Sequence, residues 1–428
     1  MKIAVIGGGA KAAALAVRAN ILRSVNVGTD IHVVIFEQAT IGANWSGASG
    51  YTDGQQFLCT PVERDLGYPY SPYPERVSRS LFTEYSWQAF LLSEAGQEHG
   101  GYRDWVDGGR RPPSHILFSK YLRWAVDKSG ALVRKGQVVS LTPKEGKWRV
   151  HYLTDGRNKA STSRDLFDGI VVTGPGTASR VKTVGSSARV FDGMAMWRDL
   201  PKVERALNRL RTDDPITIVG AGGTAAAILA WLIRRGQQER HISIVASQPA
   251  FFTRGDSVFE NRLFNDDDAW QRLSSTARQT FGDRLNRGVV WDSVMSQVST
   301  AKRVRFHYGK ATEIRAVRGG MEVSIKSSKG EYSEIDASLV FDAAGFDPWW
   351  WLKLLPNDYF PGRDKAALIE ELQPMMSEQL RFQGASWTLP PLHAPMLASQ
   401  IGPGFGSLMS LGAMAERVLS TYLTGHNP

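Results

Sequence analysis

The stretch KIAVIGGGAKAAALAV, from Lys2 to Val17, decides the fold of this chain. An apolar run typical of a buried parallel strand leads into a glycine turn, and an alanine-rich segment typical of a helix follows, from Ala10 to about Arg23. A second stretch of the same design, ITIVGAGGTAAAILAWL, runs from Ile216 to Leu232. Both copies therefore have the strand before the turn and the helix after it that a dinucleotide-binding βαβ unit requires.

Three positions in each turn have a physical role in such a unit. The first glycine allows a tight turn, the second lets the backbone approach a diphosphate, and the third position lets helix and strand pack closely. These positions are Gly7, Gly9 and Ala12 in the first copy, and Gly220, Gly222 and Ala225 in the second. The pair predicts an α/β fold with two Rossmann-like dinucleotide-binding domains.

The ends of the following strands differ between the two units. The strand Ile31 to Phe36 closes on Glu37, a carboxylate placed to accept hydrogen bonds from a ribose hydroxyl pair. The strand from His241 to Ala246 ends at Ser247 without an acid. Because a carboxylate would repel a ribose 2′-phosphate, the second unit favours NADPH, with Ser247 and Arg254 as the candidate phosphate ligands.

Composition narrows the class of protein. At 428 residues, 42% apolar and 22% charged, the chain is long enough for two or three globular domains. Its single cysteine, Cys59, excludes the paired-cysteine centre of the disulfide reductases, which also carry two dinucleotide motifs, and is interpreted as a small buried residue. The net charge of +9 is scattered, and no motif indicates nucleic-acid binding. With neither a signal peptide nor a membrane-spanning run, we expect a cytoplasmic protein without a membrane partner.

Other segments are predicted from pattern alone. The Gly-, Pro- and Tyr-rich stretch from Ile41 to Pro74 predicts a long ordered loop. Apolar spacing predicts helices around 84–93 and 114–128, antiparallel strands at 131–141 and 148–153, a strand at 168–173 that returns to the first sheet, a strand at 339–341, and a C-terminal helix from Gly404. We expect an FAD-binding domain at 1–205, an inserted NADPH-binding domain at 206–335, and completion of the first domain with a substrate-site segment at 336–428.

Taken in order, these segments resemble the flavin-dependent N-hydroxylating monooxygenases of the siderophore-type lysine and ornithine hydroxylases. The carriers are GGGAKA, GANWSGASGYTDG with Trp45, ERDLGYPY around Arg64 and Asp65, YSWQAFL, YLRWA, FFTRGDSVFENRLF around Asn261, FDAAGF, and QIGPGFGSLMSLG. The resemblance covers nearly the whole chain.

The resemblance implies FAD and NADPH as cofactors, and a small-molecule amine and O2 as reactants. NADPH reduces FAD, oxygen adds to the flavin as a C4a-hydroperoxide, and a free primary amine attacks the distal oxygen. The substrate pocket would lie where the two domains meet. Such proteins often form dimers or tetramers, but no feature of this sequence reports an interface.

The resemblance also implies roles for individual residues. Asn261 aligns with an asparagine that contacts substrate beside the nicotinamide ribose, and Arg64 stands where relatives have a lysine that binds the substrate carboxylate. Ser410 is a further candidate for substrate contact, and Trp45, Gly404 and Ser407 are candidates for contact with FAD. A reactive flavin needs a site that excludes water, for which Trp45, Phe259 and the run Trp349 to Trp351 are candidate walls, although packing at a domain edge also explains the tryptophan run.

The amine itself stays open at this stage. The side-chain amine of L-lysine is the leading expectation, in siderophore or related biosynthesis, with L-ornithine, a diamine or an aryl-alkyl amine as alternatives within the same chemistry. A flavin monooxygenase acting on sulfur or carbon is a second alternative. The third is a nucleotide-binding protein that has lost catalysis, although neither glycine turn is broken.

Overall fold

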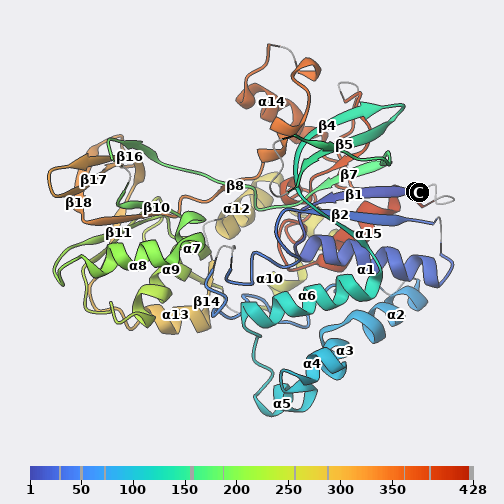
Figure 1. Ribbon diagram of the computed structural model, residues 1–428, viewed down its shortest axis with the longest axis horizontal. Coiled ribbons are helices and arrows are strands. Elements are labelled where there is room, and N and C mark those ends of the chain that lie inside the picture. Colours follow the sequence, from blue (N-terminus) through green and yellow to red (C-terminus); the bar gives the residue numbers. More distant parts are fainter. Residues whose placement is uncertain are drawn as a thin grey trace.

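A computed structural model of the chain describes residues 1–27, 30–48, 52–71, 74–154, 159–186, 188–254, 257–286, 289–360, 362–384 and 387–423. Figure 1 shows two lobes side by side along the long axis, each built on its own five-stranded sheet. Each glycine turn belongs to a different sheet, so the predicted α/β class with two Rossmann-like units is confirmed.

The first sheet has the strand order β21-β7-β1-β2-β3, and every neighbouring pair is parallel. Its strands are β1 (Lys2–Ile6), β2 (His32–Glu37), β3 (Leu132–Lys135), β7 (Gly169–Val172) and β21 (Leu392–His393). The predicted return of the chain at 168–173 is confirmed by β7, and β21 brings in the C-terminal part.

One strand prediction was wrong in its direction. The segment 131–141 was expected to be antiparallel, but its first part forms β3, which pairs parallel with β2. The reason is the long connection between the two strands, since a crossover of a dozen or more residues can bring the chain back in the same direction. Only the second part, β4 (Gln137–Lys144), pairs antiparallel, with β5 (Lys147–Leu153).

Alternate residues of the central strand β1 pack into two different hydrophobic cores, one on each face of the sheet. Ile3 and Val5 pack in the cluster formed with α1 (Ala10–Ser24), α6 (His115–Ser129) and α15 (Leu411–Ser420). Ala4 and Ile6 pack on the opposite face, with β4 and β5. A strand buried on both faces explains why the first run of the sequence is almost continuously apolar.

The second sheet has the order β10-β19-β11-β12-β15 and is also parallel throughout. Its strands are β10 (Val190–Asp192), β11 (Ile216–Val219), β12 (Ile242–Ala246), β15 (Val304–Tyr308) and β19 (Leu339–Asp342). The helix α9 (Gly223–Arg234) packs against one face, and a four-stranded sheet covers the other. That sheet, in the order β18-β17-β16-β9, contains β9 (Lys182–Val184), β16 (Lys310–Val317), β17 (Gly320–Lys326) and β18 (Tyr332–Ala337).

The second sheet includes strands from outside the span 206–335, which was expected for the inserted domain. The strands β10 and β19 lie outside that span yet belong to the sheet that carries the second turn. The two chain segments that join the lobes meet as an antiparallel pair, β8 (Thr177–Ala178) with β20 (Phe346–Asp347).

The remaining elements are mostly short. The other strands are β6 (Ser161–Thr162), β13 (Phe252–Arg254) and β14 (Val289–Trp291). The other helices are α2 (Glu75–Tyr85), α3 (Trp87–Leu92), α4 (Glu94–Gln97), α5 (Gly101–Asp107), α7 (Ala195–Arg198), α8 (Leu200–Asn208), α10 (Val258–Arg262), α11 (Asp267–Gln271), α12 (Ser275–Asn286), α13 (Asp292–Val298) and α14 (Lys365–Leu372), with 3-10 turns at Trp350–Leu354, Asn357–Tyr359, Gln373–Met375 and Pro395–Leu397. Among the helices within the described ranges, none has both the length and the hydrophobicity needed to cross a membrane.

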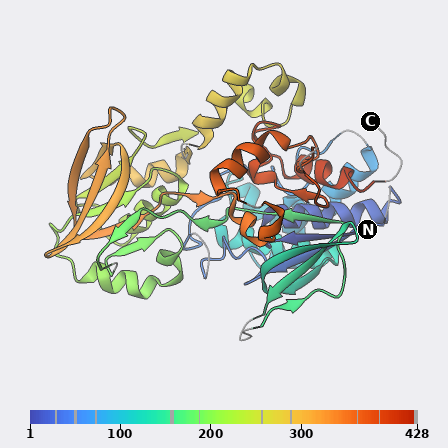
Figure 2. The ribbon, with the colours of Figure 1, turned by 90° about the horizontal axis from the view of Figure 1, so that it is seen from above.

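The segment from α10 to α12 follows the second turn in sequence but contacts the first lobe. Figure 2 shows its helices above the junction of the two lobes. Trp270 donates its indole N–H to the carbonyl of Gln400, 3.0 Å away, and Gln400 in turn donates to Gln279. This segment therefore connects the second unit to the C-terminal tail.

Candidate functional site

The two glycine turns have nearly the same backbone geometry. Gly7 and Gly220 adopt φ of +102° and +104°, values that residues with a side chain rarely adopt. Gly9 and Gly222 are the residues before α1 and α9, with φ, ψ of −89°, −166° and −90°, −173°. Each turn thus directs the first amides of a helix toward the same edge of its sheet, where a diphosphate would be bound.

A different side chain supports each turn. The Gly8 N–H donates to Glu37 Oε2 at 2.6 Å, and the Ala39 N–H donates to Oε1 at 2.7 Å. In the second unit, Gln248 donates its side-chain amide to the Ala221 carbonyl at 2.9 Å. Sequence analysis assigned no role to Gln248, because its burial and its contact with Ala221 appear only in the folded chain.

Strand register shows which residue replaces Glu37 in the second unit. Ile6 is opposite Phe36 in the first sheet, and Val219 is opposite Val245 in the second. The counterpart of Glu37 is therefore Ala246, and Ser247 lies one residue further, on the exposed surface. Arg254 is the last residue of β13, and its side chain lies outside the described structure.

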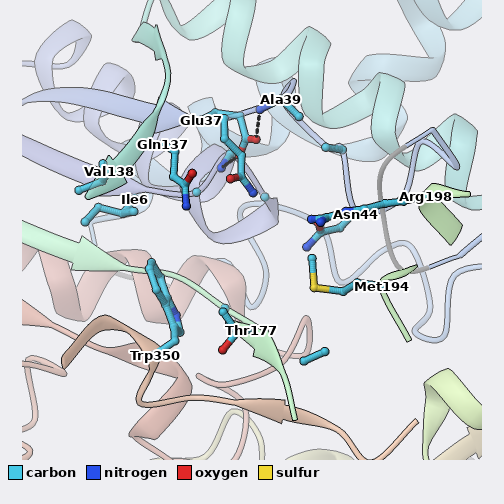
Figure 3. Close-up of a pocket in the computed structure, with 18 of the residues that line it drawn as sticks. Ile6, Glu37, Ala39, Asn44, Gln137, Val138, Thr177, Met194, Arg198 and Trp350 are labelled. Carbon is cyan, nitrogen blue, oxygen red and sulfur yellow. Dashed lines mark hydrogen bonds between the residues drawn. The ribbon is translucent and has the colours of Figure 1, made fainter. Parts of the chain in front are cut away.

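A cavity of about 1080 Å³ opens at the first turn. Its lining comes from Gly7 to Gly9, the ends of β2, β5 and β7, the start of β4, residues between 191 and 202 of the second lobe, and Trp350 and Lys353. Figure 3 shows Glu37 and its hydrogen bond to Ala39 on one side, with Asn44, Met194 and Arg198 together at one end. The volume is at the upper end for a ligand pocket, as an extended dinucleotide requires.

The basic side chains that line this cavity come mainly from outside the first βαβ unit. Arg198 and Lys202 belong to the second lobe, and Lys353 to the segment after β20. Within the part of the chain that the structure describes, the side chains of these three residues form no ion pair. Arg180 is paired with Asp192 at 2.5 Å. The unpaired cations favour an anionic ligand.

The second turn does not line this cavity. It lies beside the loop of the first lobe, where Gln56 donates to the Ala227 carbonyl at 3.4 Å and Asp53 forms an ion pair with Arg234. A Cβ on Gly193 would meet Thr224 at 2.9 Å, so the start of α9 is also closely approached by the β10–α7 turn.

Arg64 lies in a polar group that we name the Arg64 cluster: Arg64, Tyr68, Asn265 and Ser410. The Arg64 guanidinium lies over the Tyr68 ring, 5.1 Å from its centre. Asn265 donates to the Tyr68 hydroxyl at 3.0 Å, and the Ser410 Oγ lies 2.6 Å from Asn265 Oδ1. The structure therefore brings together the two predicted substrate residues Arg64 and Ser410, through Tyr68 and Asn265, which sequence analysis missed.

Asn261 lies one helical turn before Asn265. It is half-buried in α10, and its side-chain amide makes no hydrogen bond to the residues that the structure describes. Ser257 caps this helix by accepting a hydrogen bond from the Glu260 N–H at 3.3 Å. The Asn261 amide is therefore available for a ligand contact, four residues before Asn265 of the Arg64 cluster.

The tail residues mainly shape the turn before α15. A Cβ on Gly404 would lie 2.3 Å from Ser410 Oγ, so Gly404 allows that close approach. Ser407 Oγ donates to the Gly404 carbonyl at 3.1 Å and accepts from the Met409 N–H at 3.1 Å. The expected helix start at Gly404 was wrong, because these side-chain bonds hold a turn and α15 begins at Leu411.

The aromatic candidates separate into three groups. Trp45 packs edge-on against Phe118, with ring centres 5.4 Å apart, and lies close to Gly9. Trp350 lines the cavity, whereas Trp349 and Trp351 belong to the core of the first lobe. Phe259 is 77% exposed on α10, so the structure contradicts its role as a wall.

Cys59 is exposed, so the prediction of a buried cysteine was also wrong. From Thr52 to Thr60 the loop alternates, with even-numbered residues buried and Gln55, Phe57 and Cys59 exposed. Alternation of this kind follows from an extended backbone, which places successive side chains on opposite sides.

The buried carboxyl of Asp65 holds the loop that carries Arg64. Tyr70 donates its hydroxyl to Asp65 at 2.6 Å, and the Trp87 N–H donates at 2.8 Å. Burial raises the pKa of Asp65 to about 6, although these hydrogen bonds act in the opposite direction. Asp65 therefore has a structural role beside the candidate substrate residues.

Comparison with known sequences supports the chemistry that these residues suggest. Residues 84–337 match the family model described as L-lysine 6-monooxygenase/L-ornithine 5-monooxygenase. The L-lysine N6-monooxygenase MbtG of Mycobacterium sp. (strain MCS) is 33% identical over 437 residues, covering 98% of this chain and 95% of the relative. MbtG of Mycobacterium tuberculosis (strain H37Rv) is 30% identical and covers 99% and 96%.

Solved structures of lysine and ornithine hydroxylases have the same fold as this chain. The lysine monooxygenase NbtG from Nocardia farcinica superposes with a TM-score of 0.79 at 28% identity, covering 97% of this chain and 99% of that protein. The ornithine N-hydroxylase KtzI of Kutzneria sp. 744 shares the fold, with a TM-score of 0.72 at 17% identity and 98% coverage of both chains. The chain therefore belongs to the L-lysine 6-monooxygenase/L-ornithine 5-monooxygenase family, flavin-dependent enzymes that N-hydroxylate amines of the lysine and ornithine type.

Proposed function

We propose that this enzyme hydroxylates the side-chain amine of L-lysine, using FAD, NADPH and O2. The observation that carries the proposal is the pair of matching glycine turns on two sheets of one chain, of which the first opens into a cavity of about 1080 Å³. The choice of lysine is supported by the full-length similarity to the lysine N6-monooxygenases MbtG and by the likeness to NbtG.

The cavity at the first glycine turn is suited to FAD. The amides at the start of α1 would hold the diphosphate, and Glu37, which lines the cavity, would accept a ribose hydroxyl. Trp45 beside Gly9, and the Gly404 to Ser407 turn, would lie toward the flavin end. Bound FAD supplies the redox chemistry, accepting a hydride from NADPH and activating O2.

The second turn would hold NADPH. Neither Ala246 nor Ser247 is acidic, so these two positions would not repel a 2′-phosphate. Ser247 and Arg254 remain the proposed phosphate ligands. The structure of KtzI contains reduced FAD, NADP⁺ and L-ornithine, which supports two nucleotides in this family's fold.

We propose domain boundaries at the paired strands β8 and β20. The inserted NADPH-binding domain would then run from about residue 179 to 345, which includes β10 and β19 in its sheet. The FAD-binding domain would consist of the two chain ends. The segment from α10 to α12 would belong to the substrate site at the junction, because its contacts are with the tail.

The Arg64 cluster would bind the lysine carboxylate. A guanidinium stacked on Tyr68 presents a fixed, planar pair of donors, which matches carboxylate geometry. Asn261 would contact the substrate from α10, and Ser410 would act by holding Asn265. Burial of the substrate ammonium lowers its pKa, so the amine can lose its proton without a dedicated protein base.

A panel of amines tests the proposal. Hydroxylamine and hydrogen peroxide are measured with lysine, ornithine, cadaverine, putrescine and aromatic amines. We expect lysine to give the highest kcat/KM with the least peroxide. A preference for ornithine or a diamine would overturn lysine, and oxidation of sulfur or carbon compounds without any hydroxylamine would overturn the chemistry.

The role of Arg64 has its own test. Arg64→Ala should raise KM for lysine roughly ten- to a hundredfold, since a charged hydrogen bond contributes about 1.5–3 kcal/mol, and leave NADPH oxidation without substrate unchanged. The control is Arg79→Ala, which removes an exposed arginine paired with Glu75 on α2. An equal change in KM for cadaverine, which lacks the carboxylate, would contradict this role.

A further inference from the structure

Lys11 is a buried lysine at the first turn of α1. Its side chain lies among the residues of the core, and the residue is only 8% exposed. The ammonium donates to the Gly406 carbonyl at 2.9 Å and to the Ser407 carbonyl at 3.4 Å. Both acceptors are neutral, and both belong to the tail turn that contains Gly404.

The positive charge of Lys11 has no counter-ion. Among the described residues it forms no ion pair, and burial alone lowers its pKa to about 8. Arg18, on the same helix and also buried, shows the contrast, because it pairs with Glu416 at 3.1 Å. A buried cation without an anion is costly, so an uncompensated one indicates a missing partner.

The position on the helix adds to this cost. The first turn of α1 contains no acidic residue, and the amides at the N-terminus carry a partial positive charge. The ammonium and the helix end thus both contribute positive potential, and the carboxylate at this turn, Glu37, is bonded to the Gly8 N–H and not to Lys11. A bound anion would lower the energy of both.

We propose that Lys11 is a positioning residue for the bound dinucleotide: its ammonium supplies counter-charge to the diphosphate at the start of α1 while it holds the Gly406–Ser407 turn against that helix. Lys11 is not part of the cavity lining, so it acts through its charge and through the turn. The inference rests on the proposed use of FAD. It adds a link between the first glycine turn and the far end of the chain.

The test measures binding of FAD and of ADP, which share the diphosphate, to the flavin-free full-length chain. Lys11→Met should weaken both by about tenfold or more, because a charge interaction across a buried, weakly screened distance is lost. Lys11→Arg should restore most of the affinity for both ligands. The control Arg18→Met removes a paired cation of the same helix and should leave both affinities near those of the unchanged protein. Thermal unfolding without ligand shows whether each variant is folded.

Each result has a defined meaning. Equal affinities for Lys11→Met and Arg18→Met would overturn the role of Lys11. Weaker FAD binding with unchanged ADP binding would also overturn it, because the anion would then lie on the flavin side of the dinucleotide. If the unchanged protein binds no FAD, the proposed function itself fails, whatever the variants do.

Discussion

At the scale of single residues, the two glycine turns make the sharpest demands on the sequence. Gly7 and Gly220 share a positive φ, but a Cβ would meet different atoms. At Gly7 it would lie 2.3 Å from the Thr173 hydroxyl, a side-chain atom that donates to the Ile6 carbonyl at 2.7 Å. At Gly220 it would lie 2.3 Å from the Ala343 carbonyl oxygen, a backbone atom of the residue that follows β19.

Gly220→Ala should therefore destabilise the protein by about 2 kcal/mol or more, since the left-handed conformation alone costs a side chain about 1–2 kcal/mol. Gly223→Ala is the control, because its Cβ meets nothing within 4 Å and alanine favours a helix. Urea unfolding followed by tryptophan fluorescence gives the difference. Equal stability of the two variants would contradict the described geometry of the turn.

Single residues also show the limits of sequence analysis. The glycines, Glu37 and Arg64 could be found because each has a recognisable neighbour in the chain. Tyr68, Asn265 and Gln248 could not, because their roles depend on contacts with segments far away in sequence. The positions of Ser247 and Arg254 relative to NADPH stay predictions.

At the scale of elements, a buried histidine of β21 contacts the residues just after α15. His393 Nδ1 lies 2.8 Å from the Gln379 carbonyl, so this nitrogen carries the proton. Nε2 then accepts a hydrogen bond from the Tyr422 hydroxyl at 2.8 Å. Neutral imidazole satisfies both contacts, and burial, which disfavours the charged form, lowers the pKa of His393 to about 4.

This histidine predicts a loss of stability in mild acid. The unfolded chain takes up the proton near pH 6.5 and the folded protein near 4, so the contribution is complete above 6.5 and is lost as the pH falls toward 4. The difference amounts to about 3 kcal/mol. The free energy of unfolding of His393→Gln should fall less steeply over this range than that of the unchanged protein.

Asp65 acts in the opposite direction. Because its pKa is raised from 3.8 to about 6, the folded protein takes up this proton first and gains stability as the pH falls through that range. The comparison between the two proteins removes this contribution, since both retain Asp65. Parallel pH curves for the variant and the unchanged protein would contradict the role of His393.

Elements with a strong local pattern were predicted well, and those defined by their partners were not. The strands and helices that flank the glycine turns follow from apolar runs and alanine content. The direction of β3 and the start of α15 depend on a long crossover and on a side-chain-bonded turn, neither of which has a local signal.

At the scale of the whole molecule, one of the contacts between the two lobes is a small polar group on the first lobe's loop. Asp53 and Arg234 form an ion pair between the loop of the first lobe and α9, next to the hydrogen bond of Gln56. Neighbouring Arg235 pairs instead with Glu204, inside the second lobe. A variant of Arg234 therefore removes a contact between the lobes, whereas the same change at Arg235 removes a contact within the second lobe.

Arg234→Gln should speed hydrogen exchange of the segment from 52 to 58 about fivefold, which corresponds to a loss of about 1 kcal/mol in local stability. Arg235→Gln should leave this segment unchanged. Exchange followed by mass spectrometry measures both. Equal exchange in the two variants would mean that the ion pair does not hold the loop against α9.

The overall division of the chain could be predicted only in outline. Two motifs in one sequence indicate two nucleotide units, and the late apolar strand suggests that the chain returns. The hydrogen-bonded neighbours of a late strand determine the sheet to which it belongs. The strand β19 pairs with β11 in the second sheet, whereas β21 pairs with β7 and completes the first. A local pattern cannot distinguish these outcomes, because both strands are short, buried and parallel.

We propose that the enzyme transfers one oxygen atom from O2 to an amine nitrogen, with lysine as the substrate. The most direct measurement supplies the FAD-loaded enzyme with NADPH, lysine and ¹⁸O2, and analyses the product by mass spectrometry. We expect hydroxylated lysine with one heavy oxygen atom on the side-chain nitrogen. Consumption of NADPH with only labelled hydrogen peroxide, and no hydroxylamine from lysine, would contradict the account.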